Sequence, residues 1–272
     1  MTDPEWVSFL QWALPRMEMK WSGFRKVRGQ VRKRVKRRMG ALGLSRLEEY
    51  RRRLEVDSEE WGVLDRMCRI TISRFWRDRK VWEDLADTVL PALDAAARER
   101  GDERLRVWSA GCASGEEPYS VALVGAFLLT DPLPIAITAT DVDPCMLERA
   151  RDGRYQVGSL RALPEGWRVR AFEALGGKWA LREAFRVGVR FLEQDVRYQV
   201  PAGPFDLVLC RNLAFTYFTP VLQRAVAARI AGALVAGGAL VVGCHEAVPP
   251  EAPLVPWEGV RSVYYRRTHD TL

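Results

Sequence analysis

Short apolar runs alternate with helical segments over residues 105–266, and this alternation constrains the fold more than any other feature of the sequence. The runs with the length and composition of buried strands lie at 105–109, 135–140, 189–193, 206–210 and 239–243. Helical segments separate most of them, which predicts an α/β fold with a doubly wound, mostly parallel sheet and helices on both faces. A last run at 262–266 arrives without a preceding helix, so we expect it to lie antiparallel at the sheet edge.

The N-terminal third has a helical pattern instead. Every fourth residue from Val27 to Met39 is apolar within a strongly basic stretch, which predicts an amphipathic cationic helix. Ser45 followed three residues later by Glu48 has the spacing of a capping box, so the next helix is expected to begin there. Ser58 is expected to open a further helix.

These patterns predict two domains, a basic N-terminal helical domain over residues 1–90 and a larger domain over 91–272. One stretch of the larger domain, at about 158–187, does not fit the alternation of strands and helices. It is too long for a plain connection between a helix and a strand. We therefore expect a small inserted subdomain there.

The net charge of +7 is uneven, and its densest run lies at residues 32–38. Such a run indicates an acidic or polyanionic partner, or simply a solvated helix face. No apolar stretch approaches the roughly 20 residues that cross a bilayer, and the N-terminus lacks the layout of a signal peptide. We therefore expect a cytoplasmic protein without membrane insertion.

The cysteines give no sign of a metal site or a disulfide framework. There are five of them, scattered along the chain, and only two histidines. No two cysteines form a C-x-x-C pair. We expect no metal, and we expect the cysteines to be buried, reduced thiols.

Ligands of doubly wound sheets bind at the carboxyl ends of the strands, and the first such end carries two glutamates. The segment after it contains Gly111, Gly115, Glu116 and Glu117 but neither G-x-G-x-x-G nor the Lys of a phosphate-binding loop. The glutamates would repel a pyrophosphate and attract a cation. S-adenosylmethionine, with its ammonium and sulfonium groups, has the right charge. Alternatively, both glutamates only favour the positive end of the helix dipole.

Polar residues also follow the next three strands. Asp141 is placed to accept hydrogen bonds from ribose hydroxyls, unless it caps the next helix, a role for which Asp143 is better placed. Gln194 opens a segment that is a candidate contact for an adenine edge, and Asn212 follows the fourth strand. Four strand ends with compatible polar groups form a stronger signal than any one of them.

With these residues in view, the chain resembles the CheR-type methyltransferases, whose best-known members esterify glutamates of chemotaxis receptors. The resemblance runs from about Val27 to the C-terminus. Its motifs lie at 74–78, at 107–120, at Asp141 with 150–155, and at 206–212. It implies a class I, Rossmann-like methyltransferase domain, in which residues 158–187 match the family's β-subdomain.

The resemblance also implies roles for individual residues. Glu116 would hold the methionine ammonium of S-adenosylmethionine, and Asp141 the ribose. The residues implied to contact the cofactor, which leaves as S-adenosylhomocysteine, are Thr71, Ser73, Arg77, Gly111, Glu116, Asp141, Asp195, Val196, Asn212 and Leu213. The implied catalytic residues are Arg77 and Tyr217, the latter near the reactive methyl.

The chain departs from the family pattern on the acceptor side. Ser73 stands for the usual Thr, and Trp76 for the second Phe of a Phe-Phe pair. The segment after Asn212 is one residue longer than expected, which bears on the assignment of Tyr217. Trp76 is nevertheless expected to touch the acceptor. His245 has an open role, and a structural one is favoured because methyl transfer to a carboxylate needs no general base.

Several acceptors are compatible with this reading. A glutamate carboxylate is ionised at neutral pH, so Arg77 would hold it; alternatively Arg77 only pairs with Asp78. The leading hypothesis is methylation of a glutamate on an acidic protein helix, such as a receptor cytoplasmic domain, docked by the basic helix. A small-molecule acceptor in a biosynthetic pathway is the second. A catalytically weak module that binds S-adenosylmethionine or nucleic acid is the third, and retention of Arg77 argues against it. The sequence does not determine the oligomeric state.

Overall fold

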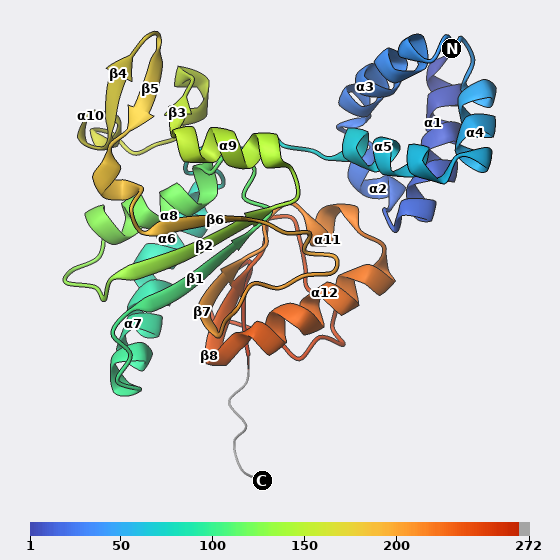
Figure 1. Cartoon of the computed structure of the whole chain (residues 1–272). Helices are drawn as coiled ribbons and strands as arrows, with labels where there is room; N and C mark the ends of the chain where they lie inside the picture. The colour runs from blue at the N-terminus through green and yellow to red at the C-terminus, as the bar shows by residue number, and fades with distance from the viewer. Residues whose placement is uncertain (267–272) are drawn as a thin grey trace. The chain divides into compact units, whose positions relative to one another are not determined.

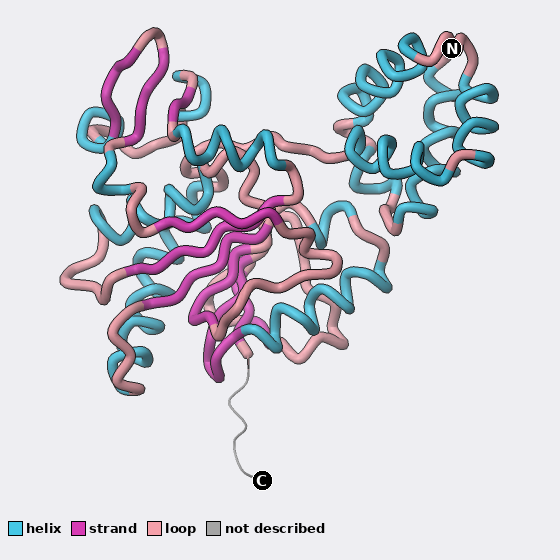
Figure 2. The backbone as a smooth tube through the Cα atoms, in the orientation of Figure 1, coloured by secondary structure: helices cyan, strands magenta, loops and turns pink. Residues whose placement is uncertain are grey.

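The computed structural model describes residues 1–266. They form two compact units, which are drawn in Figures 1 and 2. The first unit consists of Met1–Ile70 and Thr216–Leu222; the second consists of Thr71–Phe215 and the chain from Gln223 onward. The first is helical, whereas the second contains both sheets.

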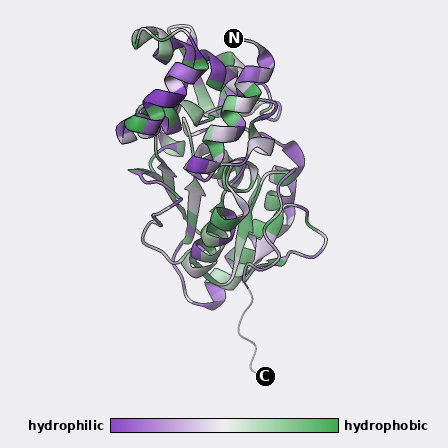
Figure 3. Cartoon of the chain, turned by 90° about the vertical axis from the view of Figure 1, so that its right-hand side faces the viewer, coloured by the Kyte–Doolittle hydropathy of each residue, from purple (hydrophilic) through white to green (hydrophobic). Residues whose placement is uncertain are grey.

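The helices of the first segment are short and amphipathic. They are α1 (Asp3–Ala13), α2 (Trp21–Phe24), α3 (Arg28–Ala41), α4 (Leu47–Val56) and α5 (Ser58–Cys68), with a 3₁₀ turn at Leu14–Met17. Figure 3 shows hydrophilic and hydrophobic colours alternating along these ribbons. The predicted apolar stripe of α3 is confirmed, since Val31, Val35 and Met39 are buried together with Trp6 and Tyr50.

The cap of α4 corrects the sequence prediction by one residue. The helix begins at Leu47, so its third residue is Glu49 rather than Glu48. The Glu49 carboxylate accepts hydrogen bonds from the backbone N–H groups of Ser45 and Arg46, at 2.9 and 3.0 Å. A capping glutamate must stand at the third helical position, and that position depends on where the helix starts.

The main sheet of the second unit has the strand order β6-β2-β1-β7-β8-β10-β9. Its strands are β1 (Leu105–Ala110), β2 (Ile135–Asp141), β6 (Val189–Glu193), β7 (Phe205–Leu209), β8 (Leu234–Val241), β9 (Val255–Pro256) and β10 (Val263–Tyr265). The first five in spatial order are parallel, as predicted. The last strand, β10, is antiparallel as expected, but it is not at the edge, because β9 pairs with its outer side.

The remaining helices cover the sheet or lie in its connections. They are α6 (Arg79–Asp84), α7 (Leu90–Glu99), α8 (Glu116–Phe127), α9 (Pro144–Asp152), α10 (Trp167–Ala171), α11 (Ala214–Tyr217) and α12 (Pro220–Ala233). Figure 1 shows α7 and α8 on one side of the strands and α12 on the other. Buried residues of α7 and α8 pack with those of β1 and β7 in one core.

The two units divide at Ile70 and Thr71, some way before the boundary predicted near residue 90. A boundary at 90 would cut a nearly continuous helical stretch, because α6 runs through a π-helical turn (Leu85–Val89) into α7. Pro91 has no N–H to donate, which explains the widened turn just before it. The apolar face of this stretch packs in the core of the second unit, so it belongs there.

The inserted segment forms a second, three-stranded antiparallel sheet in the order β3-β5-β4. Its strands are β3 (Arg154–Tyr155), β4 (Phe172–Leu175) and β5 (Lys178–Leu181). It therefore begins slightly before the predicted residue 158. The buried rings of Tyr155, Phe172 and Trp167 join this insertion to the core of the second unit.

Cysteine burial differs from the prediction in part. All five thiols are free, and Cys68, Cys112 and Cys210 are buried, but Cys145 and Cys244 are exposed. Cys145 lies in the first turn of α9, and Cys244 lies in the loop after β8, so neither faces a core. Within residues 1–266, none of the helices has the length and apolar character needed to span a membrane.

Candidate functional site

The loops after β1, β2, β6 and β7 meet at one edge of the sheet, because these strands are parallel neighbours. The register pairs Ala110 with Thr140, and Asp141 with Glu193, so the loops begin at matching heights. The candidate residues that these loops carry, together with Ser73 and Arg77 from the segment before α6, all belong to the second unit.

The loop between β1 and α8 makes a close approach that only glycine allows. Gly111 has a φ of +74°, and a Cβ added to it would lie 2.3 Å from Cδ2 of Leu213. Ala113 and Gly115 also have positive φ angles. The turn therefore leads the chain sharply from β1 into α8 and brings two predicted site residues, Gly111 and Leu213, together.

Glu116 is a buried carboxylate that the protein does not neutralise. Its exposed fraction is 2%, and the Ser114 hydroxyl lies 3.0 Å from each of its oxygens, while Ser73 also hydrogen-bonds to it. Across the described chain, no Lys or Arg comes within ion-pair distance of it. Burial raises the pKa of Glu116, and the hydroxyls only partly offset this effect.

Glu117 has the opposite surroundings. Its carboxylate accepts a hydrogen bond from the Ser109 hydroxyl at 2.8 Å and lies 3.4 Å from Nη1 of Arg211. The Arg211 guanidinium is itself buried and also pairs with Asp78 at 3.0 Å. Burial raises the pKa of Glu117 while the Arg211 charge opposes that rise. Glu117 is thus satisfied by the protein, unlike Glu116.

Asp141 organises the loop around it. Its Oδ2 accepts a hydrogen bond from the Ala113 N–H at 2.8 Å, and its Oδ1 accepts one from the Asp143 N–H at 2.9 Å. Asp143 in turn caps α9 by accepting from the N–H of Cys145, which confirms the prediction that Asp143 is the better placed of the two aspartates to cap this helix.

Arg77 reaches across to the end of β7. Its Nη2 donates to Oδ1 of Asn212 and its Nη1 to the carbonyl of Ile72, both at 3.1 Å. Its contact with the Asp78 carboxylate is long, at 4.0 Å, because Arg211 holds that carboxylate instead. The shortest contacts of Arg77 are therefore with neutral acceptors, and its pair with Asp78 is long.

The end of β6 is only partly available for a ligand. Asp195 forms a two-pronged ion pair with Arg197, whose Nε and Nη2 lie 2.9 and 2.7 Å from its Oδ2. Val196 is buried. By contrast, Oε1 of Gln194 is buried and has no hydrogen-bond partner among the described residues. The side chain with a free acceptor at this position is thus Gln194.

Other predicted residues have different settings. Trp76 is buried at 4% exposure and stacks on Trp82, and its contact with an acceptor stays a prediction. Thr71 is half-buried at the start of the second unit. Tyr217 groups with the first unit, where its ring lies 4.9 Å from that of Phe24. His245 is exposed.

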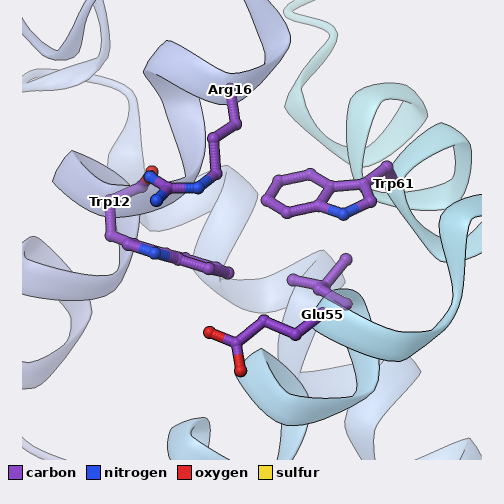
Figure 4. A pocket seen from close by; sticks show the side chains of 5 residues that line it. Trp12, Arg16, Glu55 and Trp61 are labelled. Carbon is purple, nitrogen blue, oxygen red and sulfur yellow. The ribbon is translucent and has the colours of Figure 1, made fainter.

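The first unit contains a pocket of about 400 Å³ that the sequence did not indicate. Figure 4 shows Trp12 and Trp61 beside each other, with Arg16 and Glu55 around them; Leu54 completes the lining. The guanidinium of Arg16 lies 4.7 Å from the Trp12 ring centre, so the protein's own cation covers this ring. The pocket contains none of the predicted site residues.

Sequence reasoning missed three charged residues that hold the site together. Arg211 and Asp78 tie the segment of Arg77 to the end of β7, since Arg211 also donates to the Arg77 carbonyl at 2.7 Å. Glu246 accepts from the Asn212 N–H at 2.7 Å. The available signal for Asp78 and Arg211 was that they stood inside the quoted motifs next to residues given a role, whereas Glu246 lies outside those motifs.

The class of protein follows from the sheet and its loops. Numbered along the chain, the strands of the main sheet have the order 3-2-1-4-5-7-6, with the seventh antiparallel. The first five strands thus have the 3-2-1-4-5 order of a Rossmann-like, doubly wound sheet, whose ligands bind at the carboxyl ends of the strands, where acidic residues follow the first two strands here.

The family is identified by comparison with known proteins. Residues 71–257 match the model of the CheR methyltransferase, SAM binding domain. The chain is 35% identical over 229 residues to chemotaxis protein methyltransferase 1 of Pseudomonas aeruginosa, covering 80% of this chain and 81% of that protein. It is 34% identical over 200 residues to the chemotaxis protein methyltransferase of Listeria monocytogenes, covering 74% of each. The chain therefore belongs to the CheR methyltransferase family.

A further relative is much longer. An uncharacterised 104.1 kDa protein of Rhodobacter capsulatus is 34% identical over 223 residues, which is 81% of this chain but 23% of that protein. The matching segment is thus one part of a larger chain there. For the present chain, the family match shows an S-adenosylmethionine-dependent methyltransferase.

Proposed function

We propose that this enzyme methylates glutamate carboxylates on an acidic protein helix, such as the cytoplasmic domain of a chemotaxis receptor, and that it does so in the cytoplasm. We also propose that its two compact units act as separate domains. One contrast carries the proposal. The site holds a buried carboxylate, Glu116, without a cation, and a guanidinium, Arg77, whose contact with a carboxylate, that of Asp78, is long at 4.0 Å. A cationic cofactor and an anionic acceptor would satisfy both.

On the cofactor side, we assign the methionine ammonium to Glu116 and the ribose hydroxyls to Asp141. The two oxygens of Asp141 accept hydrogen bonds from the N–H groups of Ala113 and Asp143, which fix the carboxylate at the end of β2. Gly111, which has no side chain, would let the ligand approach the backbone, and Leu213 packs closely on it. Ser73 would support the Glu116 carboxylate, and Thr71 lies two residues before it in the sequence.

For the adenine, we assign the ends of β6 and β7. Asn212 and Leu213 line one side, and Val196 supplies an apolar surface. The Asp195 carboxylate is already paired with Arg197, so it would act mainly by shaping the loop. The free Oε1 of Gln194 is better suited to accept a hydrogen bond from an adenine amino group.

The chemistry requires alignment rather than proton transfer. When bound, S-adenosylmethionine supplies an electrophilic methyl group on a sulfonium. An oxygen of the ionised acceptor carboxylate forms the new bond to the methyl carbon as the carbon–sulfur bond breaks, and the electron pair stays on sulfur. Arg77 would hold the second carboxylate oxygen through a charge-assisted hydrogen bond, and this orientation lowers the entropic barrier.

The acceptor surface that we propose is narrower than the whole basic run. Arg38 pairs with Glu60 inside the first unit, and Arg34 donates to the carbonyls of Met67 and Arg69 at the end of α5. These two cations are therefore structural. The exposed cations of α3 that lack such partners are Lys33, Lys36 and Arg37, and they share one helix face.

The test combines binding and transfer. Calorimetry should show that the enzyme binds S-adenosylhomocysteine, and labelled S-adenosylmethionine should label glutamates of a receptor cytoplasmic fragment. Arg77→Lys keeps the charge but loses the planar fork, so turnover should fall roughly tenfold or more while cofactor affinity changes little. Arg79→Lys, an exposed neighbour paired with Glu83, is the matched control.

Three results would contradict parts of the proposal. Absence of S-adenosylhomocysteine binding by the intact chain would overturn the cofactor assignment. If Arg77→Ala labels its acceptor at the wild-type rate, Arg77 has no part in holding the carboxylate. Labelling of a small molecule instead of the receptor fragment would move the acceptor to the small-molecule class.

A further inference from the structure

We infer that Glu246 is a positioning residue, whose carboxylate works with Gly243 to hold Asn212 in the conformation that the cofactor site needs. The inference rests on the proposed function in one respect, the assignment of Asn212 to the cofactor site. No role was assigned to Glu246 or Gly243 from the sequence.

Glu246 and Gly243 lie just beyond the point where the hydrogen bonding between β7 and β8 ends. Strands β7 and β8 are parallel, with Leu209 beside Val241, and the N–H of Cys210 still donates to the Val241 carbonyl at 2.9 Å. Beyond this point the N–H groups of Asn212 and Gly243 both donate to one atom, Oε2 of Glu246, each at 2.7 Å. A single carboxylate oxygen thus joins the two strand ends where no strand carbonyl does.

The clamp holds Asn212 in a left-handed backbone conformation. Its φ is +56°, in a region that few residues other than glycine adopt and that asparagine tolerates better than most. In this conformation its Oδ1 accepts the hydrogen bond from Nη2 of Arg77 at 3.1 Å. Glu246 therefore acts on the site through Asn212, and through Asn212 on Arg77.

Gly243 provides the space for this arrangement. A Cβ at Gly243 would lie 2.8 Å from Oε2 of Glu246 and 3.0 Å from Oδ1 of Asn212. The turn itself closes with a hydrogen bond from the Glu246 N–H to the Gly243 carbonyl at 2.8 Å. A side chain at position 243 would therefore push the Glu246 carboxylate and the Asn212 side chain apart.

A double-mutant cycle separates positioning from a general structural role. Affinity for S-adenosylhomocysteine is measured by calorimetry for the wild type, Glu246→Gln, Asn212→Gly and the double variant. Glu246→Gln should weaken binding roughly tenfold in the wild-type background, because a neutral amide clamps the two N–H groups less firmly. In the Asn212→Gly background the same change should have less than about a twofold effect, because glycine needs no clamp at a positive φ.

Equal losses in both backgrounds, accompanied by a lower melting temperature, would overturn the inference and leave Glu246 as a structural residue. Gly243→Ala should reproduce the loss seen for Glu246→Gln. Gly232→Ala is its control, since a Cβ there meets nothing within 4 Å. If the wild type itself fails to bind S-adenosylhomocysteine, the proposed function is wrong. If the wild type binds it and the Glu246→Gln and Gly243→Ala variants bind it with the same affinity, the inference about Glu246 is wrong.

Discussion

The two units of this enzyme treat a buried carboxylate in opposite ways. In the first unit, Glu60 is almost fully buried, and Arg38 and the Tyr50 hydroxyl both hydrogen-bond to it. In the second unit, Glu116 is equally buried but meets only hydroxyl groups. The hydrogen bond from Arg38 lowers the pKa of Glu60, whereas burial raises the pKa of Glu116.

This difference separates a carboxylate that stabilises the folded chain, that of Glu60, from one that is suited to bind a ligand, that of Glu116. A buried carboxylate with its own cation contributes to the stability of the folded chain at neutral pH. One without a cation reduces that stability, and it persists where a ligand supplies the missing charge. The exposed cations of α3, Lys33, Lys36 and Arg37, are likewise charges without a partner in the part of the chain that the structure describes, but they are positive and lie at the surface of the first unit.

The largest effect is expected from Glu116→Gln. Removing the negative charge should weaken the affinity for S-adenosylmethionine by roughly 100-fold, since a charge-assisted contact to the ligand ammonium is lost. The ligand-free protein should melt at a higher temperature, because an uncompensated buried charge is gone. Calorimetry and thermal melting measure both effects, with exposed Glu148→Gln as the control.

The pH dependence follows from the same residue. The raised pKa of Glu116 means that lowering the pH neutralises it sooner than an ordinary glutamate, whose pKa is about 4.3. Cofactor affinity should therefore fall on the acid side at a higher pH than that value. The stability of the ligand-free protein should rise over the same range, because the folded form binds the proton more tightly. An affinity that is flat with pH down to 4.3 would contradict this account.

The next effect concerns the first unit. Arg38→Met should lower the free energy of unfolding by about 2 kcal/mol, because Glu60 would remain buried beside Tyr50 without a cation. The wild-type contribution exists above a pH of about 4.3 and is lost as the pH falls through the lowered pKa of Glu60. Urea unfolding at neutral pH measures the loss. Arg37→Met, an exposed neighbour on α3, should change little.

The smallest effect should come from the exposed cations of α3. Reversing Lys33, Lys36 and Arg37 to Glu should raise the Michaelis constant for an acidic receptor fragment several-fold and reduce its salt dependence. Affinity for S-adenosylhomocysteine should stay constant. The control reverses exposed Arg104, Arg224 and Arg261, which changes the net charge equally. If the two sets raise the Michaelis constant alike, the face on α3 has no special role in docking.

Much of the fold could be predicted because it depends on local pattern. The strand segments, the α3 stripe and the cap by Asp143 all follow from residues close together in the sequence. The prediction was less accurate where an element's role depends on distant partners. The helical stretch around Pro91 joined the second unit because its apolar face packs there. The outer strand β9 was missed because two residues carry no pattern of their own.

The sequence by itself determined the order of strands and helices, the candidate loops at the strand ends and the family. It could do so because spacing and motif are properties of neighbouring residues. Only the tertiary structure decided which of two adjacent glutamates lacks a cation, since the partner of Glu117 is Arg211, far along the chain. It likewise decided that Arg34 and Arg38 serve the fold and that Glu246 holds Asn212. Whether a charge is free depends on which residues the fold brings beside it, and sequence separation does not record that.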